Sequence, residues 1–434
     1  MQARRKGGVI LSTMCVLGLG YIGLPTAALF ATHGYAVLGV DIDETIVNRI
    51  NRGQIHIEEP GLNLMVKAAV NSGNLLAQTQ PEAADVFIIA VPTPITPDKR
   101  ADLSFVIAAA EAITPYLRQG NLVILESTSP PRTTADLLMP ILERSGLNAG
   151  GDFDLAHCPE RVLPGNILHE LVFNNRIVGG INESSAQAAR ALYQPIVQGE
   201  IIVTDSTSAE MAKLMENTYR DVNIALANEL SIIAADIDCD ALEVIKIANM
   251  HPRVHLHQPG PGVGGHCLAV DPWFIVEKSP NANLIHLSRK INDQMPYVIA
   301  KRIKTIVQGI SDPAVTLLGV SYKGNVDDIR ETPALPIIEQ LQSGGVAVRI
   351  YDPHVRHFPF ELMNLESALL QSDLIVILSD HNEFKYLCPA EIGRLMRHCN
   401  VFDTKNCINA AKWEEEHFTV QMLGRANRKA AVCR

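Results

Sequence analysis

The sequence lacks the cysteine patterns that define two common classes of protein. Its eight cysteines form no CxxC pair and follow no regular spacing, which argues against a zinc finger and against the disulfide framework of a small secreted protein. Positive charge is not in excess either: 37 lysines and arginines stand against 47 aspartates and glutamates, for a formal net charge of −10. This balance argues against nucleic acid or an anionic membrane as the main partner. We expect a cytoplasmic protein with reduced thiols and no bound metal.

The rest of the composition is that of a globular protein. With 434 residues, 47% hydrophobic and 19% charged, the chain is long enough for two or three domains. Residues 9–31 carry no charge and follow a basic segment, as in signal peptides and membrane spans. Glycines and a proline inside this stretch argue against a lipid-exposed helix, so we expect no membrane insertion. Met14 is a second possible start of translation, which would make residues 1–13 an extension without function.

The uncharged stretch contains the pattern of a dinucleotide-binding turn. The segment "CVLGLGYIG" is an apolar strand that runs into G-x-G-x-x-G; an alanine-rich helical run follows, and then a second strand that ends in an aspartate. In such a unit the first glycine makes the tight turn, the second admits the pyrophosphate, and the third lets helix and strand pack closely. The acid accepts hydrogen bonds from the adenosine ribose and repels a 2′-phosphate, so NAD is preferred to NADP. We predict that NAD is bound by Gly18, Gly20, Tyr21, Ile22, Gly23 and Asp41.

Further apolar runs alternate with helical stretches over the first 200 residues. They lie at residues 84–94, 121–128, 153–160 and 175–180. This alternation is typical of a parallel, doubly wound sheet. The hydroxyls of Thr93, Ser127 and Thr128 come just after strand ends, where ligands bind in such sheets. We expect Thr93 and Thr128 to contact the cofactor.

A long helix is predicted in the middle of the chain. From Ser208, a plausible N-cap, about thirty residues follow with helical periodicity and without glycine or proline, which gives a helix roughly 45 Å long. Lys213, Asn217 and Arg220 recur at spacings of four and three residues and form one polar stripe. The stripe is either a solvated face or part of a site, and we favour a site because the usual glutamate partners are missing.

A second α/β pattern begins after residue 312. A strand, a helix with a glycine stop and a further strand ending in Asp352 follow one another, without G-x-G-x-x-G. In its place stands "GVSYKGNVDDIRE", whose Lys323 and Arg330 suit the phosphates of a different nucleotide. We therefore predict an α/β fold with two Rossmann-like, doubly wound domains, joined by a central helical domain that contains one long helix. The predicted boundaries are 1–198, 199–308 and 309–434.

One thiol stands in an unusual setting, the segment "GPGVGGHCLAVDP" at residues 260–272. Glycines let a backbone or a ligand approach closely, so Cys267 is either a buried residue in a strained turn or a nucleophile on a substrate floor. In the second case we expect the glycines to make room for the substrate. A metal ligand is a third possibility, but the spacing of a metal site is absent. With a dinucleotide site, a thiolate permits a four-electron oxidation. An alcohol becomes an aldehyde, the thiolate adds to give a thiohemiacetal, and a second oxidation gives a thioester that water hydrolyses to an acid.

These motifs together resemble the UDP-glucose/GDP-mannose dehydrogenase family over nearly the whole chain. The segments occur in the family's order: "GLGYIGLPTA", "CPERVLPG", "AEMAKLMENTYRDVNIALANEL", "HPRV…QPGPGVGGHCLAVDPWF" and "YKGNVDDIRETPA". The linked pairs "GGHC" and "DPWF" most resemble the branch that oxidises UDP-N-acetyl-D-mannosamine. The resemblance implies that the C6 hydroxyl becomes a carboxylate, for use in bacterial surface polysaccharides.

The resemblance also implies a role for each matching residue. Cys267 is the nucleophile, Asp271 helps organise water, Lys213 stabilises the oxyanion with Asn217 as its companion, and Glu160 beside Thr128 activates the hydrolytic water. The positions expected near the UDP-sugar are Arg161, Val162, Lys213, Asn217, Arg220, His251, Arg253, Gly264, Tyr322 and Lys323, and Arg330 is expected near the cofactor. In relatives the residue matching Arg253 reaches over from a neighbouring subunit, which implies a homodimer or a larger homo-oligomer.

Some positions depart from the UDP-glucose enzymes of the family. Those enzymes carry a second glutamate where Pro164 stands, serine and phenylalanine beside the cysteine where His266 and Leu268 stand, and lysine in place of Val270. The departures weaken a glucose assignment and make the role of Glu160 less certain. The sequence does not fix the configuration at C2 of the sugar, so UDP-N-acetyl-D-glucosamine is the alternative substrate. A dehydrogenase that stops at the aldehyde and a sensor of nucleotide sugars without turnover are the other functional alternatives.

Overall fold

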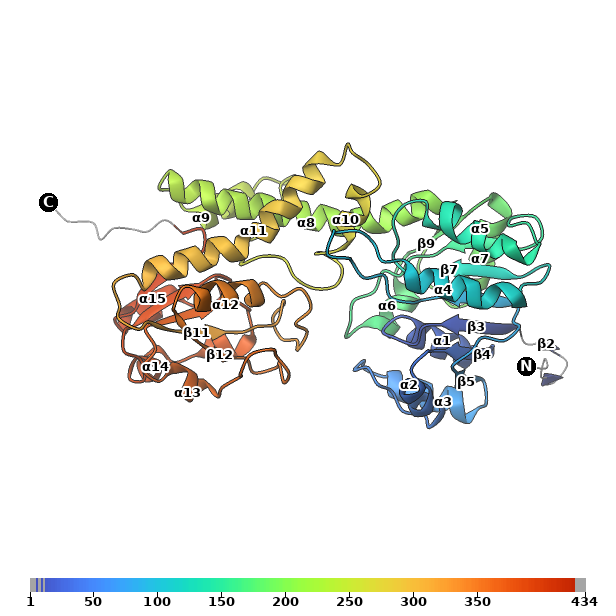
Figure 1. Ribbon diagram of the computed structural model, residues 1–434, viewed down its shortest axis with the longest axis horizontal. Coiled ribbons are helices and arrows are strands. Elements are labelled where there is room, and N and C mark those ends of the chain that lie inside the picture. The colour runs from blue at the N-terminus through green and yellow to red at the C-terminus, as the bar shows by residue number, and fades with distance from the viewer. Residues whose placement is uncertain (1–4, 7–8, 11, 426–434) are drawn as a thin grey trace. The chain divides into compact units, whose positions relative to one another are not determined.

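The computed structural model describes residues 5–6, 9–10 and 12–425 (Figure 1). The chain divides into two compact units: unit 1 comprises Met1–Glu216 with Trp273–Pro280, and unit 2 comprises Asn217–Pro272 with Asn281–Arg434. The division falls inside the long helix α8 (Ser206–Asp236) and inside the short helix α10 (Asp271–Val276). The three domain boundaries drawn from the sequence stay a prediction, and much of the predicted extension at residues 1–13 lies outside the described residues.

Unit 1 is built on an eight-stranded sheet in the order β10-β9-β8-β7-β6-β3-β4-β5. Its strands are β3 (Thr13–Leu17), β4 (Ala36–Val40), β5 (Leu75–Gln78), β6 (Val86–Ile89), β7 (Leu122–Leu125), β8 (Asp154–His157), β9 (Arg176–Gly180) and β10 (Ile201–Asp205). Strands β3, β6 and β7 are buried over nearly their full length, because helices cover both faces of the sheet. Ahead of this sheet in the chain, the two-residue strands β1 (Arg5–Lys6) and β2 (Val9–Ile10) pair antiparallel with each other.

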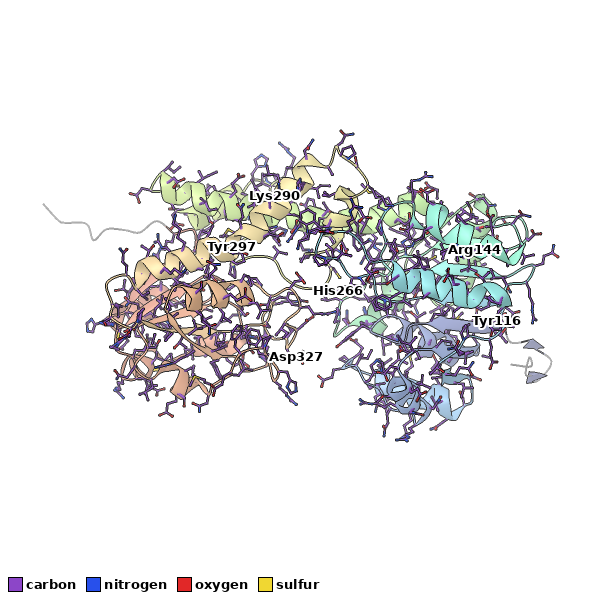
Figure 2. The ribbon with its side chains drawn as sticks, in the orientation of Figure 1. Tyr116, Arg144, His266, Lys290, Tyr297 and Asp327 are labelled. Carbon is purple, nitrogen blue, oxygen red and sulfur yellow. The ribbon has the colours of Figure 1, made fainter. Side chains whose placement is uncertain are left out.

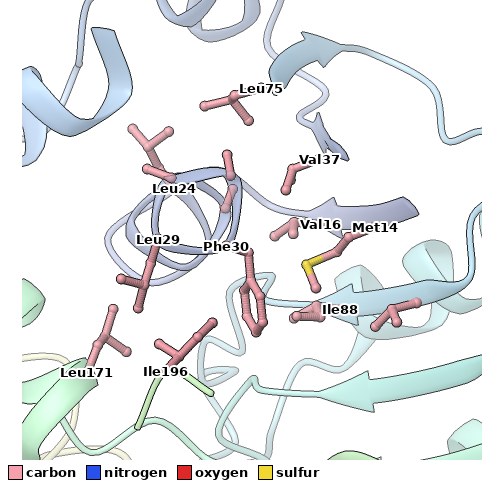
Figure 3. Packing of buried hydrophobic residues seen from close by; sticks show 14 of the residues in the cluster. Met14, Val16, Leu24, Leu29, Phe30, Val37, Leu75, Ile88, Leu171 and Ile196 are labelled. Atoms are coloured by element: carbon pink, nitrogen blue, oxygen red, sulfur yellow. The ribbon is translucent and has the colours of Figure 1, made fainter. Parts of the chain in front are cut away.

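The helices of unit 1 form two layers. One core packs α1 (Gly23–Thr32), α3 (Leu62–Asn71), α6 (Ile167–Phe173) and α7 (Glu183–Tyr193) on the sheet. In Figure 3, Phe30 of α1 lies among Val16, Ile88 and Ile196 of this core. The other face carries α4 (Ser104–Ile113), the π-helix Thr133–Leu138 and α5 (Met139–Leu142). Helix α2 (Glu44–Asn51) follows β4 and packs beside β5.

Unit 2 contains a smaller, fully parallel sheet in the order β12-β11-β13-β14-β15. The strands are β11 (Ala314–Leu318), β12 (Ala347–Tyr351), β13 (Leu374–Ile377), β14 (Asn400–Asp403) and β15 (Thr419–Met422). Helices α11 (Asn283–Ile306) and α12 (Ala334–Ser343) cover one face, and Lys290 and Tyr297 mark α11 in Figure 2. The short helices α13 (Leu365–Leu369), α14 (Pro389–Gly393) and α15 (Ala410–Glu415) follow the later strands, and α9 (Ala241–Ala248) follows α8.

Two expectations need correction. The sheet of unit 1 is not wholly parallel, since β9 runs antiparallel to β8. The chain between these strands forms only the short helix α6 and does not cross back to the other end of the sheet, so β9 starts beside the end of β8 and runs in the opposite direction. Ser208 is not the N-cap of α8, which begins at Ser206; instead, the Asp205 carboxylate accepts hydrogen bonds from the Ser208 N–H (2.9 Å) and Oγ (2.6 Å). A carboxylate in this position also interacts favourably with the helix dipole.

No helix in the described part of the chain is long and apolar enough to cross a membrane. Within the uncharged stretch, Val9–Ile10 and Thr13–Leu17 are short strands, and Gly23 begins the ten-residue helix α1 of unit 1.

Candidate active site

The glycine turn after β3 has a geometry that only glycine permits. Gly18 has φ +88°, and a Cβ there would lie 2.5 Å from the Ala90 carbonyl oxygen. A Cβ on Gly23 would lie 1.8 Å from the Gly18 oxygen, so α1 starts directly against the turn. Beside Gly20, in contrast, no atom lies within 4 Å of the Cβ position. The turn therefore leaves space at its second glycine, where a pyrophosphate fits, in front of the first turn of α1.

Asp41 holds this turn from the end of β4. Its Oδ2 accepts a hydrogen bond from the Leu19 N–H (3.0 Å), and its Oδ1 accepts one from the Asp43 N–H (3.0 Å). Asp41 is half-buried, and a carboxylate has about four acceptor positions, so capacity remains for the hydroxyls of a ribose. The residues present thus fit an NAD adenosine as predicted from the sequence.

The predicted hydroxyls brace the neighbouring strand ends. The buried Thr93 hydroxyl donates to the Thr128 carbonyl oxygen (2.7 Å), and the Ser127 hydroxyl donates to that of Val91 (2.7 Å). The structure therefore gives Thr93 a partner within the protein, and its contact with cofactor stays a prediction. Thr128 is half-buried at the same carboxyl edge of the sheet.

Glu160 and Lys213 form an ion pair in unit 1. The Lys213 Nζ lies 3.3 Å from the Glu160 Oε1, and the two side chains are 8% and 12% exposed. Glu160 also accepts a hydrogen bond from the Val162 N–H (2.9 Å). Arg161 beside it donates to the Asn175 carbonyl oxygen (2.9 Å) and pairs with Glu216 at 2.5 Å. The lysine of the predicted polar stripe therefore does have an acidic partner, contributed by the segment after β8.

Two buried acids of unit 1 were not predicted from the sequence. Glu210, one turn before Lys213, accepts hydrogen bonds from the Arg132 N–H (2.5 Å), the Thr134 N–H (2.7 Å) and the Thr134 hydroxyl (2.7 Å). Burial raises the pKa of Glu210 to about 7. It thereby ties α8 to the start of the π-helix that follows Thr128.

The second buried acid, Glu126, directly follows β7. Its Oε1 pairs with Arg176 at 2.9 Å and accepts from the Tyr193 hydroxyl at 2.8 Å, while the Arg176 guanidinium lies 4.0 Å from the Tyr193 ring centre. Burial raises the pKa of Glu126, although Arg176 acts in the opposite direction. Neither acid had a local sequence signal, because the partners are distant in the chain.

In unit 2, Cys267 lies exposed at the end of the glycine-rich segment. Its carbonyl oxygen accepts from the N–H groups of Val270 (3.1 Å) and Asp271 (2.8 Å), which opens α10. The buried Asp271 carboxylate accepts a hydrogen bond from the Asn217 side chain at 2.6 Å. The structure thus brings Asn217 into contact with Asp271, which follows Cys267 by four residues.

The glycines before Cys267 require a different explanation from the one we inferred. A Cβ on Gly264 would lie 2.5 Å from the Glu331 oxygen, and one on Gly265, where φ is +87°, would lie 2.8 Å from the Tyr322 ring. The Gly265 N–H also donates to the Arg330 carbonyl oxygen at 2.9 Å. The space beside these two glycines is therefore occupied by the protein's own loop, not by a sugar. The expectation that they make room for the substrate is wrong for these side-chain positions, and a contact of the Gly264 backbone stays a prediction.

The loop after β11 brings cationic and aromatic side chains to the same segment. Arg330 makes a bidentate pair with Asp328, its Nη2 and Nε lying 2.6 and 3.0 Å from the two carboxylate oxygens. This pair raises the pKa of the Arg330 guanidinium. Lys323 is exposed, and burial raises the pKa of Tyr322, to which Asp328 and Cys267 also contribute. Figure 2 labels Asp327 on this loop and His266, which directly precedes Cys267 in the glycine-rich segment.

Three predicted substrate positions are exposed, one on a helix and two in the segment that follows α9. Arg220 lies on α8, and His251 and Arg253 follow α9. The Arg253 N–H donates to the His251 Nδ1 at 3.3 Å, and neither side chain is brought to Cys267 by a described contact. Their roles stay predictions, as does the contribution of Arg253 to another subunit.

One group of described residues has the composition of a metal site: His354, His381 and Glu383, whose ligand atoms lie within 4.8 Å of one another. The Asn325 N–H donates to the His381 Nδ1 (2.8 Å), so the neutral ring carries its proton on Nε2, which faces Asp352 at 3.2 Å. That tautomer leaves no lone pair for a metal. The group is therefore a hydrogen-bonded support for the loop, rather than a set of metal ligands.

Comparison with known proteins covers nearly the whole chain. Residues 12–197 match the NAD binding domain of the UDP-glucose/GDP-mannose dehydrogenase family, residues 207–294 match its central domain, and residues 316–410 match its UDP binding domain.

Individual relatives are similar over their full length. The UDP-N-acetyl-D-mannosamine dehydrogenase of Methanococcus vannielii is 49% identical over 95% of this chain and 97% of its own. The NDP-N-acetyl-D-galactosaminuronic acid dehydrogenase of Ralstonia solanacearum is 48% identical over 92% and 97%. The solved structure of the UDP-N-acetyl-mannosamine dehydrogenase Cap5O from Staphylococcus aureus, 48% identical, has a TM-score of 0.87 and covers 96% of this chain and 99% of that one. The predicted fold class is thereby confirmed.

Proposed function

The chain belongs to the UDP-glucose/GDP-mannose dehydrogenase family and is an NAD-dependent UDP-sugar dehydrogenase. We propose that it oxidises UDP-N-acetyl-D-mannosamine at C6. One UDP-sugar, two NAD and one water give the UDP-uronic acid and two NADH. The observation that carries this proposal is the exposed thiol of Cys267, held four residues before an Asp271 that is bonded to Asn217. The names of relatives similar over their full length support the choice of sugar.

The residues of the chain divide the chemistry between them. NAD, when bound at the turn of Gly18, Gly20 and Asp41, supplies the hydride acceptor for each of the two oxidations. The thiolate of Cys267 adds to the C6 aldehyde and forms a carbon–sulfur bond. The resulting thiohemiacetal is oxidised to a thioester, and water then breaks the carbon–sulfur bond, releasing the acid and the thiol.

Proton transfer falls to the polar side chains. Lys213, a buried ammonium beside Glu160, stabilises the oxyanion of the tetrahedral adducts. Glu160 takes a proton from the hydrolytic water. Asp271 helps organise water and proton transfer, and Asn217 is the companion of Lys213. Predictions from the sequence that accompany this mechanism are a homodimer or larger oligomer, a cytoplasmic location and a product destined for surface polysaccharide.

The first test is the number of NADH molecules formed per sugar, measured by absorbance with limiting UDP-N-acetyl-D-mannosamine and excess NAD. We expect two. One NADH per sugar would mean that the enzyme stops at the aldehyde, and none would refute the substrate. Cys267→Ala should lower acid formation by at least about 1,000-fold, whereas Cys388→Ala, which removes another exposed thiol, should not change it.

The sugar itself needs a separate comparison, because relatives named for two different sugars are about equally similar to this chain. UDP-N-acetyl-D-glucosamine and UDP-N-acetyl-D-galactosamine should be offered under the same conditions. We expect kcat/KM at least tenfold higher for the manno sugar, and a preference for either of the others would reassign the substrate.

A further inference from the structure

Two buried residues of α8 lie on the same helix face as Asn217. Asp221 follows it by four residues and Asn228 by eleven, which stacks the three side chains along one side of the helix. Asp221 and Asn228 are both fully buried. Neither belongs to the mechanism proposed above.

The first of them pairs with an arginine from α11. The Arg289 Nη1 lies 2.5 Å from the Asp221 Oδ1, and the same nitrogen donates a longer hydrogen bond, 3.4 Å, to the carbonyl oxygen of Leu268. Arg289 is 1% exposed and also pairs with Asp293. The pair therefore reaches the residue that directly follows Cys267.

The second residue holds the other end of the same segment. The Asn228 Oδ1 accepts a hydrogen bond from the Gly260 N–H (2.8 Å), and its Nδ2 donates to the Asn292 Oδ1 (2.9 Å). Asn292 in turn donates to the Asp221 Oδ1 at 2.8 Å. Asp221, Asn228, Arg289 and Asn292 thus form one connected set, which we call the polar ladder.

The cost of such a set argues for a role beyond folding. A buried ion pair loses the hydration of both charges, and replacing one by apolar residues of similar volume is often neutral or stabilising. Burial raises the pKa of Asp221, against the effect of Arg289, which is a measure of that lost hydration. Stability alone therefore gives little reason for charges here, whereas a fixed direction for hydrogen bonds does.

We propose that the polar ladder positions Cys267 by holding both ends of residues 260–268, at the Gly260 N–H and the Leu268 carbonyl oxygen. These four are positioning residues, because their bonds to this segment are made to its backbone, at the Gly260 N–H and the Leu268 carbonyl oxygen. The inference rests on the proposed function, in which Cys267 is the nucleophile. Its consequence is that the thiol has one orientation before the substrate arrives.

The test replaces the ion pair without leaving a lone buried charge. The double variant Asp221→Leu/Arg289→Met should remain folded and keep KM for the UDP-sugar within about threefold, while kcat falls about 10- to 100-fold, as expected for a misplaced reacting group. Arg289→Lys keeps the charge but loses the planar guanidinium, which can bond two partners at once. Its kcat should lie between those of the parent and the double variant. Thr316→Val, a buried hydroxyl of β11 bonded to the Ala368 carbonyl oxygen, is the matched control: it should lower stability without lowering kcat.

A second readout does not depend on turnover. Alkylation of the full-length protein by iodoacetamide, with modified peptides quantified by mass spectrometry, gives the rate at Cys267 against Cys388 as internal reference. The double variant should change the rate of alkylation at Cys267 at least threefold, because a loosened segment no longer holds the exposed thiol in one orientation. Unchanged alkylation in a folded variant overturns the positioning role, and so does an unchanged kcat. Absence of turnover in the unmodified protein would instead refute the proposed function, and alkylation would still decide on the ladder.

Discussion

The two sheets of the molecule begin with the same strand–turn unit and complete it differently. In unit 1 the Gly18 N–H donates to the Val40 oxygen (2.8 Å), and in unit 2 the Gly319 N–H donates to the Tyr351 oxygen (2.9 Å). Both glycines have positive φ, +88° and +83°. In both units, the aspartate after the second strand accepts a hydrogen bond from the N–H of the residue that follows this glycine. Asp41 accepts from Leu19 at 3.0 Å, and Asp352 accepts from Val320 at 2.7 Å.

The two units differ in the chain that comes after this glycine. In unit 1 a helix starts at Gly23, five residues after Gly18, whereas in unit 2 the helix starts only at Ala334, after a loop with Lys323 and Arg330. Asp352 is also more fully engaged than Asp41. Besides two turn N–H groups, it accepts from the N–H groups of two later residues and from His381.

The same strand–turn frame therefore presents different groups in the two units. A helix that starts at the turn offers backbone N–H groups and its dipole, while a longer loop offers charged side chains instead. The acid is left available for a ligand in unit 1, and it is used internally in unit 2. We expect substitutions at matching positions to give different kinds of loss.

The largest effect should come from closing the turn of unit 1. Gly23→Ala puts a Cβ 1.8 Å from the Gly18 oxygen, so we expect a loss of about 3 kcal/mol or more in the free energy of unfolding, measured in urea. Gly20→Ala has nothing within 4 Å of its Cβ and should weaken NAD binding while leaving stability nearly unchanged. Equal stability losses for the two would contradict the distinct roles of these glycines.

The next largest effect concerns the acid of unit 2. Burial alone would raise the pKa of Asp352, but hydrogen bonds from His381 and backbone N–H groups lower it to about 2. Its stabilising contribution is therefore present above about pH 4 and is lost as the pH falls from 4 towards 2. Asp352→Asn should lower the free energy of unfolding by about 2 kcal/mol at pH 7 and flatten its dependence on acid pH. A variant as stable as the parent at pH 7 would show that these hydrogen bonds contribute little.

The acid of unit 1 should affect cofactor choice more than stability. Asp41→Asn keeps an oxygen for the Leu19 N–H but removes the charge that repels a 2′-phosphate. We expect the preference for NAD over NADP, as a ratio of kcat/KM, to fall about 10- to 100-fold. Unchanged discrimination in a folded variant would refute the assignment of Asp41 to the ribose.

The smallest effect is expected from the exposed cation of the unit 2 loop. Lys323→Ala should raise KM for the UDP-sugar about 3- to 10-fold, and the difference from the parent should shrink at high salt, because exposed charges are screened. Lys412→Ala, in the exposed part of α15, is the matched loss of charge. An equal rise in KM for both would show that only net charge matters.

The parts of the fold with local signals were predicted from the sequence. The glycine turn with Asp41, the alternation of strands and helices and the long helix are each encoded within a few turns of chain, and the family resemblance is confirmed. The direction of β9 could not be read, since an apolar run of five residues pairs equally well either way. Asp205 was overlooked as the cap because Ser208, three residues later, carries an equally good local signal.

Contacts between distant residues account for what was missed at the site. Nothing near Asp221 in the sequence indicates Arg289, 68 residues away, and Glu210 meets Thr134 from 76 residues away. Gly264 and Gly265 do mark a close approach, but the atoms that fill their space come from Tyr322 and Glu331. A glycine indicates that something approaches closely; it does not indicate whether that is a ligand or the chain itself.

The reversed strand β9 has a consequence for how this enzyme can vary. Because β9 runs antiparallel to β8, the end of β8 and the start of β9 lie on the same side of the sheet. The segment between the two strands therefore begins and ends at neighbouring points, close to the ion pair of Arg176 with Glu126. Insertions or deletions in this segment, which contains Glu160 and Arg161, need not displace any strand. A natural lineage or a laboratory library can therefore remodel the segment in length as well as composition, while the nucleotide turn on the same sheet stays intact.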